Sequence, residues 1–370
     1  MRRPTSNTFD EVLSGISAVD ASDVWAVGRF GNAGELSLGR HLDATLTLHW
    51  NGAAWAVVPS PDPSWTVKEL VGPVRASGGS LEAVDALSPT DVWAVGIGGG
   101  PFIEHWNGTR WAIVHMHPEP PGGLFGVSAV SPHDVWAVGG GGGTPLVERW
   151  NGARWHRVPI PFPGEAASLH GVAALSGDDV WVVGQFEPGT GPQERGLVEH
   201  WDGARWGIIP NPNPSPSGLT ELRSVAATSA RDAWVVGLSA SSAVEPATFA
   251  PVVEHWGGAR WEAVRIPAGP PGRDVQLSSV AVTSADQAWL AGTSSAQKPW
   301  DVPIGFVDRW NGSAWSPVDM PEALPSRNPP RYKGAVLDGV TALSGGPVWA
   351  VGRSWVGDTN HSLIERGCAG

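Results

Sequence analysis

Apolar and polar residues recur along this chain in a pattern that fits short strands. One apolar unit, Val-Trp-Ala-Val, has an aspartate before it and a glycine after it. An apolar run this short, bounded by turn residues, is typical of a strand that is buried on both faces. The unit DVWAVG and its variants occur at seven places: 23–28, 91–96, 134–139, 179–184, 232–237, 287–292 and 347–352.

A fixed register surrounds the tryptophan of each unit. In every copy a leucine stands twelve residues before it, and a valine or isoleucine stands nine residues before it. The SPTD and SPHD segments between them fit a type I turn, with serine first and proline second. The pattern therefore predicts a strand A, a tight turn and a strand B, and it gives the aspartates a role in the turn. The leucines are Leu13, Leu81, Leu124, Leu169, Leu222, Leu277 and Leu337.

A second module follows each A–B pair except the last. It has the form HWNG..W, in which the Asn-Gly pair or its Asp-Gly and Gly-Gly variants predict a hairpin turn between a strand C and a strand D. Prolines soon end strand D, which suits an outer edge strand that must not pair with other chains. The modules stand at 49–55, 105–111, 149–155, 200–206, 255–261 and 309–315.

Four antiparallel strands repeated about seven times predict an all-β fold, a seven-bladed β-propeller. All but three of the 22 tryptophans occupy fixed repeat positions, where flat indole rings fill the wedge between blades. The seventh repeat ends in SLIERG, so its blade is predicted to be incomplete. Residues 1–8 complete the ring, or the chain is a piece of a longer protein; the sequence leaves both open. One domain, 1–370, is expected, with approximate blades 11–62, 78–119, 122–163, 167–214, 220–270, 275–322 and 335–370.

Charge and composition narrow the range of partners. The formal net charge is -12, which argues against nucleic acid, because a nucleic-acid partner needs a basic face. No apolar segment approaches the length of a membrane span, and the start MRRPTSNTFDEVL lacks the apolar run of a signal peptide. The single cysteine, Cys368, excludes an internal disulfide. A monomer without a cofactor or metal ion is expected.

The order of motifs resembles that of kelch and galactose-oxidase-like propellers, and more closely that of tryptophan-rich repeat proteins, mostly bacterial, built from DVWAVG and HWNG..W units. The kelch double glycine after strand B is present only at Gly139-Gly140. Oxidase chemistry is excluded, because its copper site needs two tyrosines and a cysteine linked to one of them. This chain has a single tyrosine, Tyr332. The resemblance implies an extracellular or cell-surface location; without a signal peptide, the cytoplasm stays open.

The loops point to one face of the ring as the functional face. The A–B and C–D turns hardly vary, whereas the B–C and D–A connections vary widely in length. Binding residues tend to lie on variable loops that a rigid scaffold holds. Aromatic residues off the repeat positions fall in these loops, with arginines beside them, and could stack on a sugar or clamp a peptide. Alternatively, they fill the seam at the incomplete blade. The candidates are Trp65, Trp300, Trp355, Tyr332, Arg327 and Arg331.

Two further repeat positions carry titratable residues, and we predict structural roles for the residues at both. The residue before the strand C tryptophan alternates between histidine and arginine, which suits a hydrogen-bonding position and not a metal ligand. The residue before that is acidic in six copies, and salt bridges across strands or between blades are expected for it. His115 and His117 have strand spacing but no third ligand, so no metal site is predicted.

Three hypotheses for function remain. The first is a non-catalytic scaffold that binds a glycan or a protein through the B–C/D–A face. The second is a carbohydrate hydrolase or lyase with carboxylates in the central funnel, for which the loops offer the scattered candidates Glu187, Glu194 and Asp301. The third is a structural domain of a larger surface protein.

Overall fold

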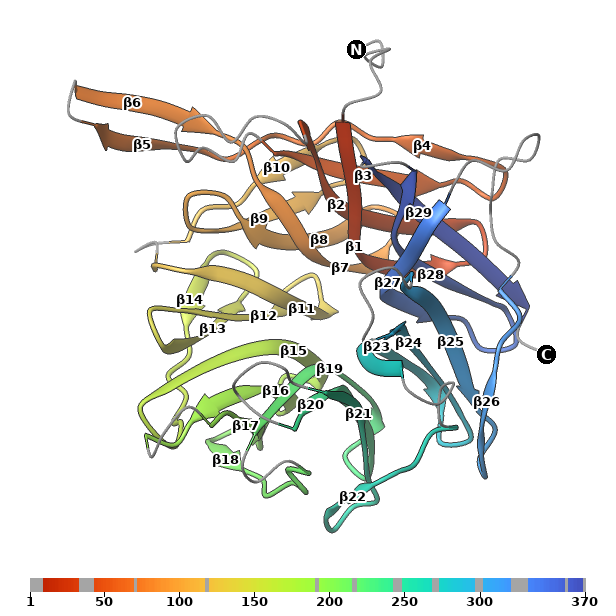
Figure 1. Cartoon of the computed structure of the whole chain (residues 1–370). Helices are drawn as coiled ribbons and strands as arrows, with labels where there is room; N and C mark the ends of the chain where they lie inside the picture. Colours follow the sequence, from red (N-terminus) through yellow and green to blue (C-terminus); the bar gives the residue numbers. More distant parts are fainter. Residues whose placement is uncertain are drawn as a thin grey trace.

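The computed structural model describes residues 9–32, 43–69, 72–116, 120–189, 193–214, 218–241, 248–267, 273–296, 302–320, 332–356 and 359–368. Their strands form eight antiparallel sheets, of which seven are arranged as blades around a common centre (Figure 1). Six of these blades have four strands each, and the last has three. The predicted seven-bladed propeller with an incomplete last blade is therefore confirmed.

Within each blade the strands pair in chain order, from the innermost strand A to the outermost strand D. Blades 1 and 2 contain β1 (Phe9–Asp20), β2 (Asp23–Asn32), β3 (Ala44–Trp50), β4 (Trp55–Val57), β7 (Ser80–Ser88), β8 (Asp91–Ile97), β9 (Pro101–Trp106) and β10 (Trp111–Ile113). Blades 3 and 4 contain β11 (Gly123–Ser131), β12 (Asp134–Gly141), β13 (Thr144–Trp150), β14 (Trp155–Arg157), β15 (Ala166–Ser176), β16 (Asp179–Glu187), β17 (Arg195–Trp201) and β18 (Trp206–Ile208). Blades 5 to 7 contain β19 (Leu219–Ser229), β20 (Asp232–Ala240), β21 (Phe249–Trp256), β22 (Trp261–Ala263), β23 (Arg273–Ser284), β24 (Gln287–Ala296), β25 (Ile304–Trp310), β26 (Trp315–Pro317), β27 (Tyr332–Ala342), β28 (Pro347–Val356) and β29 (Thr359–Cys368).

A separate hairpin interrupts the connection between blades 1 and 2. Its strands are β5 (Ser64–Glu69) and β6 (Gly72–Ser77), and they pair only with each other. In Figure 1 the hairpin extends outward from the ring, at the upper left. The sequence pattern placed Trp65 in a long loop between repeats, because the segment lies outside the repeat; the structure shows a hairpin there instead.

The repeated tryptophans pack between neighbouring blades. Trp136 of β12 in blade 3 is fully buried, and its ring lies 6.1 Å from the ring of Trp201 and 5.9 Å from that of Trp206, both in blade 4. In six of the seven blades the strand B indole thus packs against the strand C and strand D indoles of the next blade, and these rings fill the space that opens between blades toward the rim. The same arrangement joins Trp25 to Trp106 and Trp111, Trp93 to Trp150 and Trp155, Trp181 to Trp256 and Trp261, Trp234 to Trp310 and Trp315, and Trp349 to Trp50 and Trp55. Trp289 of blade 6 instead packs against aliphatic residues of blade 7, including Leu337 and Leu363.

The ring closes where blade 7 meets blade 1. Trp349 packs on the two tryptophans of blade 1, and the backbone N–H of Asn360 donates a hydrogen bond of 2.7 Å to Asp10. The hydroxyl of Ser362 donates another, of 2.9 Å, to Glu11. These contacts join β29 to β1 face to face. The predicted contribution of residues 1–8 lies outside the described residues.

The glycine that ends each DVWAVG unit is required by the backbone of strand A. A Cβ atom added to Gly184 would lie 1.9 Å from the carbonyl oxygen of Ser168, which is shorter than any real contact. The equivalent glycines of the other six blades face a strand A carbonyl oxygen at 1.9 to 2.5 Å. This close approach accompanies a β-bulge in strand A. In blade 4 the pairing register jumps from Leu169 to Gly171.

Candidate functional site

The β-bulges direct one side chain from each blade into the centre of the ring. In every strand A the register skips the residue directly after the repeated leucine. The seven skipped residues line one cavity along the axis, which we call the central channel. These channel residues are Ser14, Glu82, Phe125, His170, Arg223, Ser278 and Asp338.

A charged cluster occupies the mouth of the central channel. The guanidinium of Arg223 lies 3.0 Å from the carboxylate of Glu221, and His170 approaches the same carboxylate at 3.5 Å. The guanidinium of Arg353 lies 3.2 Å from the carboxylate of Asp338. All five side chains are half-buried, at 21 to 31% exposure, so the ion pairs remain open to a ligand.

Burial and mutual charge shift the pKa values in this cluster. Burial raises the pKa of Asp338, against the opposing effect of the guanidinium groups of Arg353 and Arg223, and Glu82 adds to the rise. Burial lowers the pKa of His170, although the carboxylate of Glu221 opposes this shift. The neutral imidazole is therefore favoured, and it can both donate and accept a hydrogen bond.

The charged cluster lies on the face that the loops indicated. Arg353 follows the strand B tryptophan by four residues, so it stands toward the B–C connection and away from the A–B turn. The mouth forms a cavity of about 380 Å³, lined also by Phe125, whose ring meets that of His170 edge-on at 5.8 Å. A cavity of this size, with convergent polar groups and an aromatic wall, has the character of a ligand site.

The structure places the predicted aromatic candidates in different settings. Trp65 lies in β5 of the projecting hairpin, and Tyr332 begins β27, where its backbone pairs with Val356. Trp355 is half-buried near the end of β28, and the guanidinium carbon of Arg353 lies 5.7 Å from its ring centroid. Trp355 is thus linked to the channel mouth through Arg353. Trp300, Arg327, Arg331 and Asp301 lie outside the described residues.

Sequence reasoning missed the channel residues, although the repeat carries a signal for them. In each copy one variable residue stands between the repeated leucine and a small residue: glycine, alanine or serine. The small residue is needed because the next blade packs against it; a Cβ on Gly171 would lie 3.1 Å from the backbone of Arg223. A variable position flanked by two constrained ones marks a side chain that the fold itself leaves free.

The histidines before the strand C tryptophans have a structural role, as the sequence indicated. Nε2 of His200 lies 2.7 Å from Asp179, the aspartate of its own DVW unit, and its ring packs on Trp181. In blade 3 the guanidinium of Arg149 takes the place of the imidazole, 2.8 Å from Asp134. The aspartates therefore do more than form the A–B turn: they hold the strand C side chain over the tryptophan.

Three of the six acidic residues of strand C do not form the expected salt bridges. Glu104, Glu199 and Glu254 are fully buried, and none of them makes an ion pair with another described residue. They face the preceding blade, where Glu254 accepts a hydrogen bond of 3.3 Å from the amide of Asn211. Burial raises the pKa of Glu104 to about 8, with a further rise from Asp62, and burial raises that of Glu199 to about 8. These carboxyls are protonated at neutral pH, and a protonated carboxyl needs no counter-charge.

Two features are absent from the part of the chain that the structure describes. No three histidine, cysteine or acidic side chains among those residues gather closely enough to hold a metal ion. The same residues include no helix that is long and apolar enough to cross a bilayer.

The chain is similar in fold to several solved propellers. A structure described as YCF48 bound to D1 peptide matches at 14% identity and a TM-score of 0.55, and the match covers 98% of this chain and 93% of that chain. The chain also matches YCF48 from Cyanidioschyzon merolae at 13% identity and a TM-score of 0.53, covering 97% of this chain and 96% of the other. A protein of unknown function from Dyadobacter fermentans matches at 12% identity and a TM-score of 0.50, with 98% and 96% covered.

These identities establish a shared propeller architecture and nothing more specific. No protein-family model and no curated protein matches the chain. The likeness to kelch propellers and to bacterial tryptophan-rich proteins therefore stays a prediction.

Proposed function

We propose that this protein is a non-catalytic propeller scaffold that binds an extended segment of a partner protein at the mouth of the central channel. One observation carries the proposal. The repeat positions that build the blades hold nearly the same residue in every copy, whereas the channel position holds five chemical types across the seven blades: serine, acid, phenylalanine, histidine and arginine. Differences concentrated on one cavity are what recognition of an asymmetric ligand requires.

The chemistry of the mouth favours a peptide. Arg223 and Arg353 can donate to carboxylates and carbonyl groups, Glu221 and Asp338 can accept from N–H groups, and Phe125 offers an apolar surface. A polypeptide presents all of these groups along one strand. One structure of similar fold is described as YCF48 bound to D1 peptide, so a propeller of this general form can bind a peptide.

The test is selection of peptides followed by measured affinities. A displayed library of random peptides is panned on the purified full chain, and the dissociation constants of enriched peptides are measured by fluorescence anisotropy. We expect Arg223→Gln and Arg353→Gln each to weaken binding about tenfold, because each removes a charge-assisted hydrogen bond. The matched control is Arg260→Gln. The side chain of Arg260 is 80% exposed and lies beside strand D of blade 5.

Two results would contradict the proposal. One is the absence of any enriched peptide. The other is a set of peptides that bind both variants as tightly as the unchanged protein while the melting temperatures also stay the same. Circular dichroism of each variant shows whether it is folded, and so distinguishes a loss of binding caused by unfolding from the expected loss.

A carbohydrate-active enzyme is the second candidate, because three carboxylates, those of Glu82, Glu221 and Asp338, reach the channel mouth. The raised pKa of Asp338 suits a general acid. Incubation with a panel of polysaccharides and assay of reducing ends would reveal turnover, which Asp338→Asn should abolish. Binding of glycans at the aromatic residues, an extracellular location, a monomeric state and a place within a larger surface protein remain proposals.

A further inference from the structure

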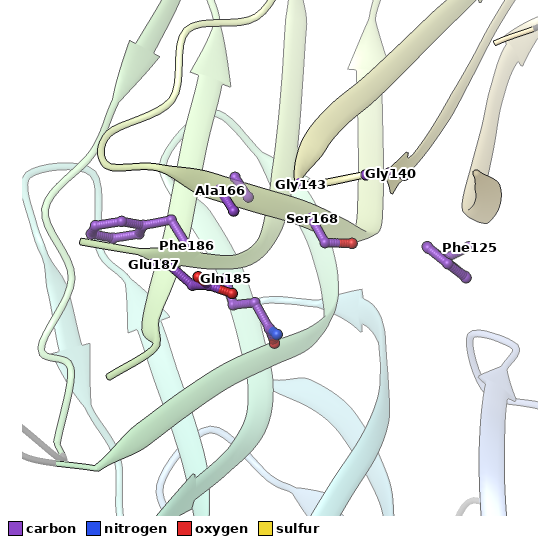
Figure 2. Close-up of a pocket in the computed structure, with 11 residues that line it drawn as sticks. Phe125, Gly140, Gly143, Ala166, Ser168, Gln185, Phe186 and Glu187 are labelled. Carbon is purple, nitrogen blue, oxygen red and sulfur yellow. The ribbon is translucent and has the colours of Figure 1, made fainter. Parts of the chain in front are cut away.

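A pocket of about 260 Å³ lies between blades 3 and 4, beside the channel mouth (Figure 2). One side consists of Gly140 and Gly141 at the end of β12 and of the two-residue turn Gly142–Gly143 that joins β12 to β13. Gly142 and Gly143 have φ angles of 60° and 80°, typical of a type I′ hairpin. This B–C connection has no side chain, and a Cβ on Gly142 would meet nothing within 4 Å. The space stays open because the glycine turn has no side chain to fill it.

Aromatic and polar side chains form the rest of the pocket. Phe186 and Phe125 stand at two sides of it, and Ser168, Gln185 and Glu187 supply polar groups (Figure 2). The side-chain oxygen of Gln185 is buried and has no hydrogen-bond partner among the described residues. Phe125 also lines the channel mouth, so one ligand can occupy both cavities.

The pocket is acidic. Its lining includes Glu187, which is exposed, and no lysine or arginine. Glu194 lies close enough to Glu187 and Glu221 to sense both charges: burial raises its pKa, and the charges of Glu221 and Glu187 raise it further. One carboxylate oxygen of Glu194 is buried with no partner in the described part of the chain. Arg223 and His170 approach Glu221, but Glu187 and Glu194 form no ion pair with a described residue.

We propose that this pocket binds a basic side chain, arginine or lysine, of the partner segment that the channel mouth holds. Glu187 provides the counter-charge, and the amide oxygen of Gln185, on the same face of β16, accepts from the ligand's N–H group. The stem of the side chain covers the glycine hairpin and Ala166. The net charge of -12 also attracts a basic partner. This inference rests on the proposed function.

A double-mutant cycle tests the proposal. In an enriched peptide, one arginine at a time is replaced by citrulline, which keeps the shape and loses the charge. We expect one position at which citrulline weakens binding to the unchanged protein about tenfold but changes binding to Glu187→Gln by less than about twofold. The matched control, Glu262→Gln, removes an exposed carboxylate from strand D of blade 5 and should respond as the unchanged protein does.

A second measurement tests the pocket without any peptide. Saturation-transfer NMR compares N-acetyl-arginine amide with N-acetyl-citrulline amide on the full chain. We expect a signal from the arginine probe alone, and its loss in Glu187→Gln but not in Glu262→Gln. Equal signals from both probes, or a signal that survives Glu187→Gln, would overturn the assignment of a basic side chain.

The two proposals fail in different ways. Peptides that need Arg223 but contain no basic residue coupled to Glu187 would refute the pocket and leave the binding scaffold in place. An arginine probe that binds at Glu187 while no peptide is enriched would refute the scaffold and retain the pocket as a site for a small cationic ligand.

Discussion

Glu199 should make the protein less stable as the pH rises, and Glu199→Gln should remove that loss. Glu199 lies in β17, on the face that packs against blade 3 beside Leu197. Its side chain is fully buried, and neither carboxylate oxygen has a partner among the described residues. Burial raises its pKa from 4.5 to about 8. The folded protein therefore holds a proton that the unfolded chain releases.

The magnitude follows from the two pKa values. A carboxyl whose pKa is raised on folding costs no stability at a pH below its unfolded-state pKa. The free energy of unfolding then falls as the pH rises from that pKa toward the folded-state pKa. One pKa unit corresponds to about 1.4 kcal/mol. Keeping Glu199 protonated at about pH 7, roughly 2.5 units above its unfolded pKa, costs at most about 3 kcal/mol. Glutamine has the same shape and no proton to lose.

The assay is urea unfolding of the unchanged protein and of Glu199→Gln at about pH 5 and about pH 7. We expect the unchanged protein to lose stability between these values, and the variant to lose less by about 2 kcal/mol. Glu262→Gln, at an exposed carboxylate, should behave as the unchanged protein does. An identical loss in Glu199→Gln and the unchanged protein would show that Glu199 ionises normally within the fold, and would refute the reasoning.

Two further substitutions test how the blades are built. Gly184→Ala should destabilise the protein by more than about 3 kcal/mol, because its Cβ would meet the carbonyl oxygen of Ser168 at 1.9 Å. Gly207→Ala, whose nearest contact would be 3.9 Å away, should change the urea midpoint little; equal effects would contradict the bulge argument. Trp206→Ala should cost about 3–5 kcal/mol in the same assay, because the edge contact with Trp136 between blades 3 and 4 is lost. A loss below about 1 kcal/mol would show that the indoles do not hold neighbouring blades together.

The repeat made the fold predictable, and it left the candidate site largely hidden. Each part of DVWAVG has a local signal: aspartate for the turn, an unbroken apolar run for a strand buried on both faces, and glycine for its end. The partner of a buried side chain has no such signal. Glu199 was expected to form a salt bridge across strands or between blades, but it faces the apolar residues of the preceding blade and its carboxylate has no partner among the described residues.

The channel residues were missed for a related reason. Regular alternation along strand A gives no special place to His170 or Arg223, since it assumes that successive side chains point to opposite faces. A β-bulge breaks the alternation at one residue and turns that side chain to the ring axis. The repeated glycine of strand B records the bulge, but the reason for that glycine becomes visible only when the two strands are paired.

The sequence by itself determined the class of the fold, the number of blades, the incomplete seventh repeat and the packing role of the repeated tryptophans between blades. These follow from periodicity, because strands, turns and their apolar faces depend on residues close together in the chain. The tertiary structure decided which side chains meet. Arg223 and Asp338 stand in blades 5 and 7, and they face one cavity only because the ring closes. The pocket beside Phe186 likewise needs the glycine hairpin of one blade against the strands of the next.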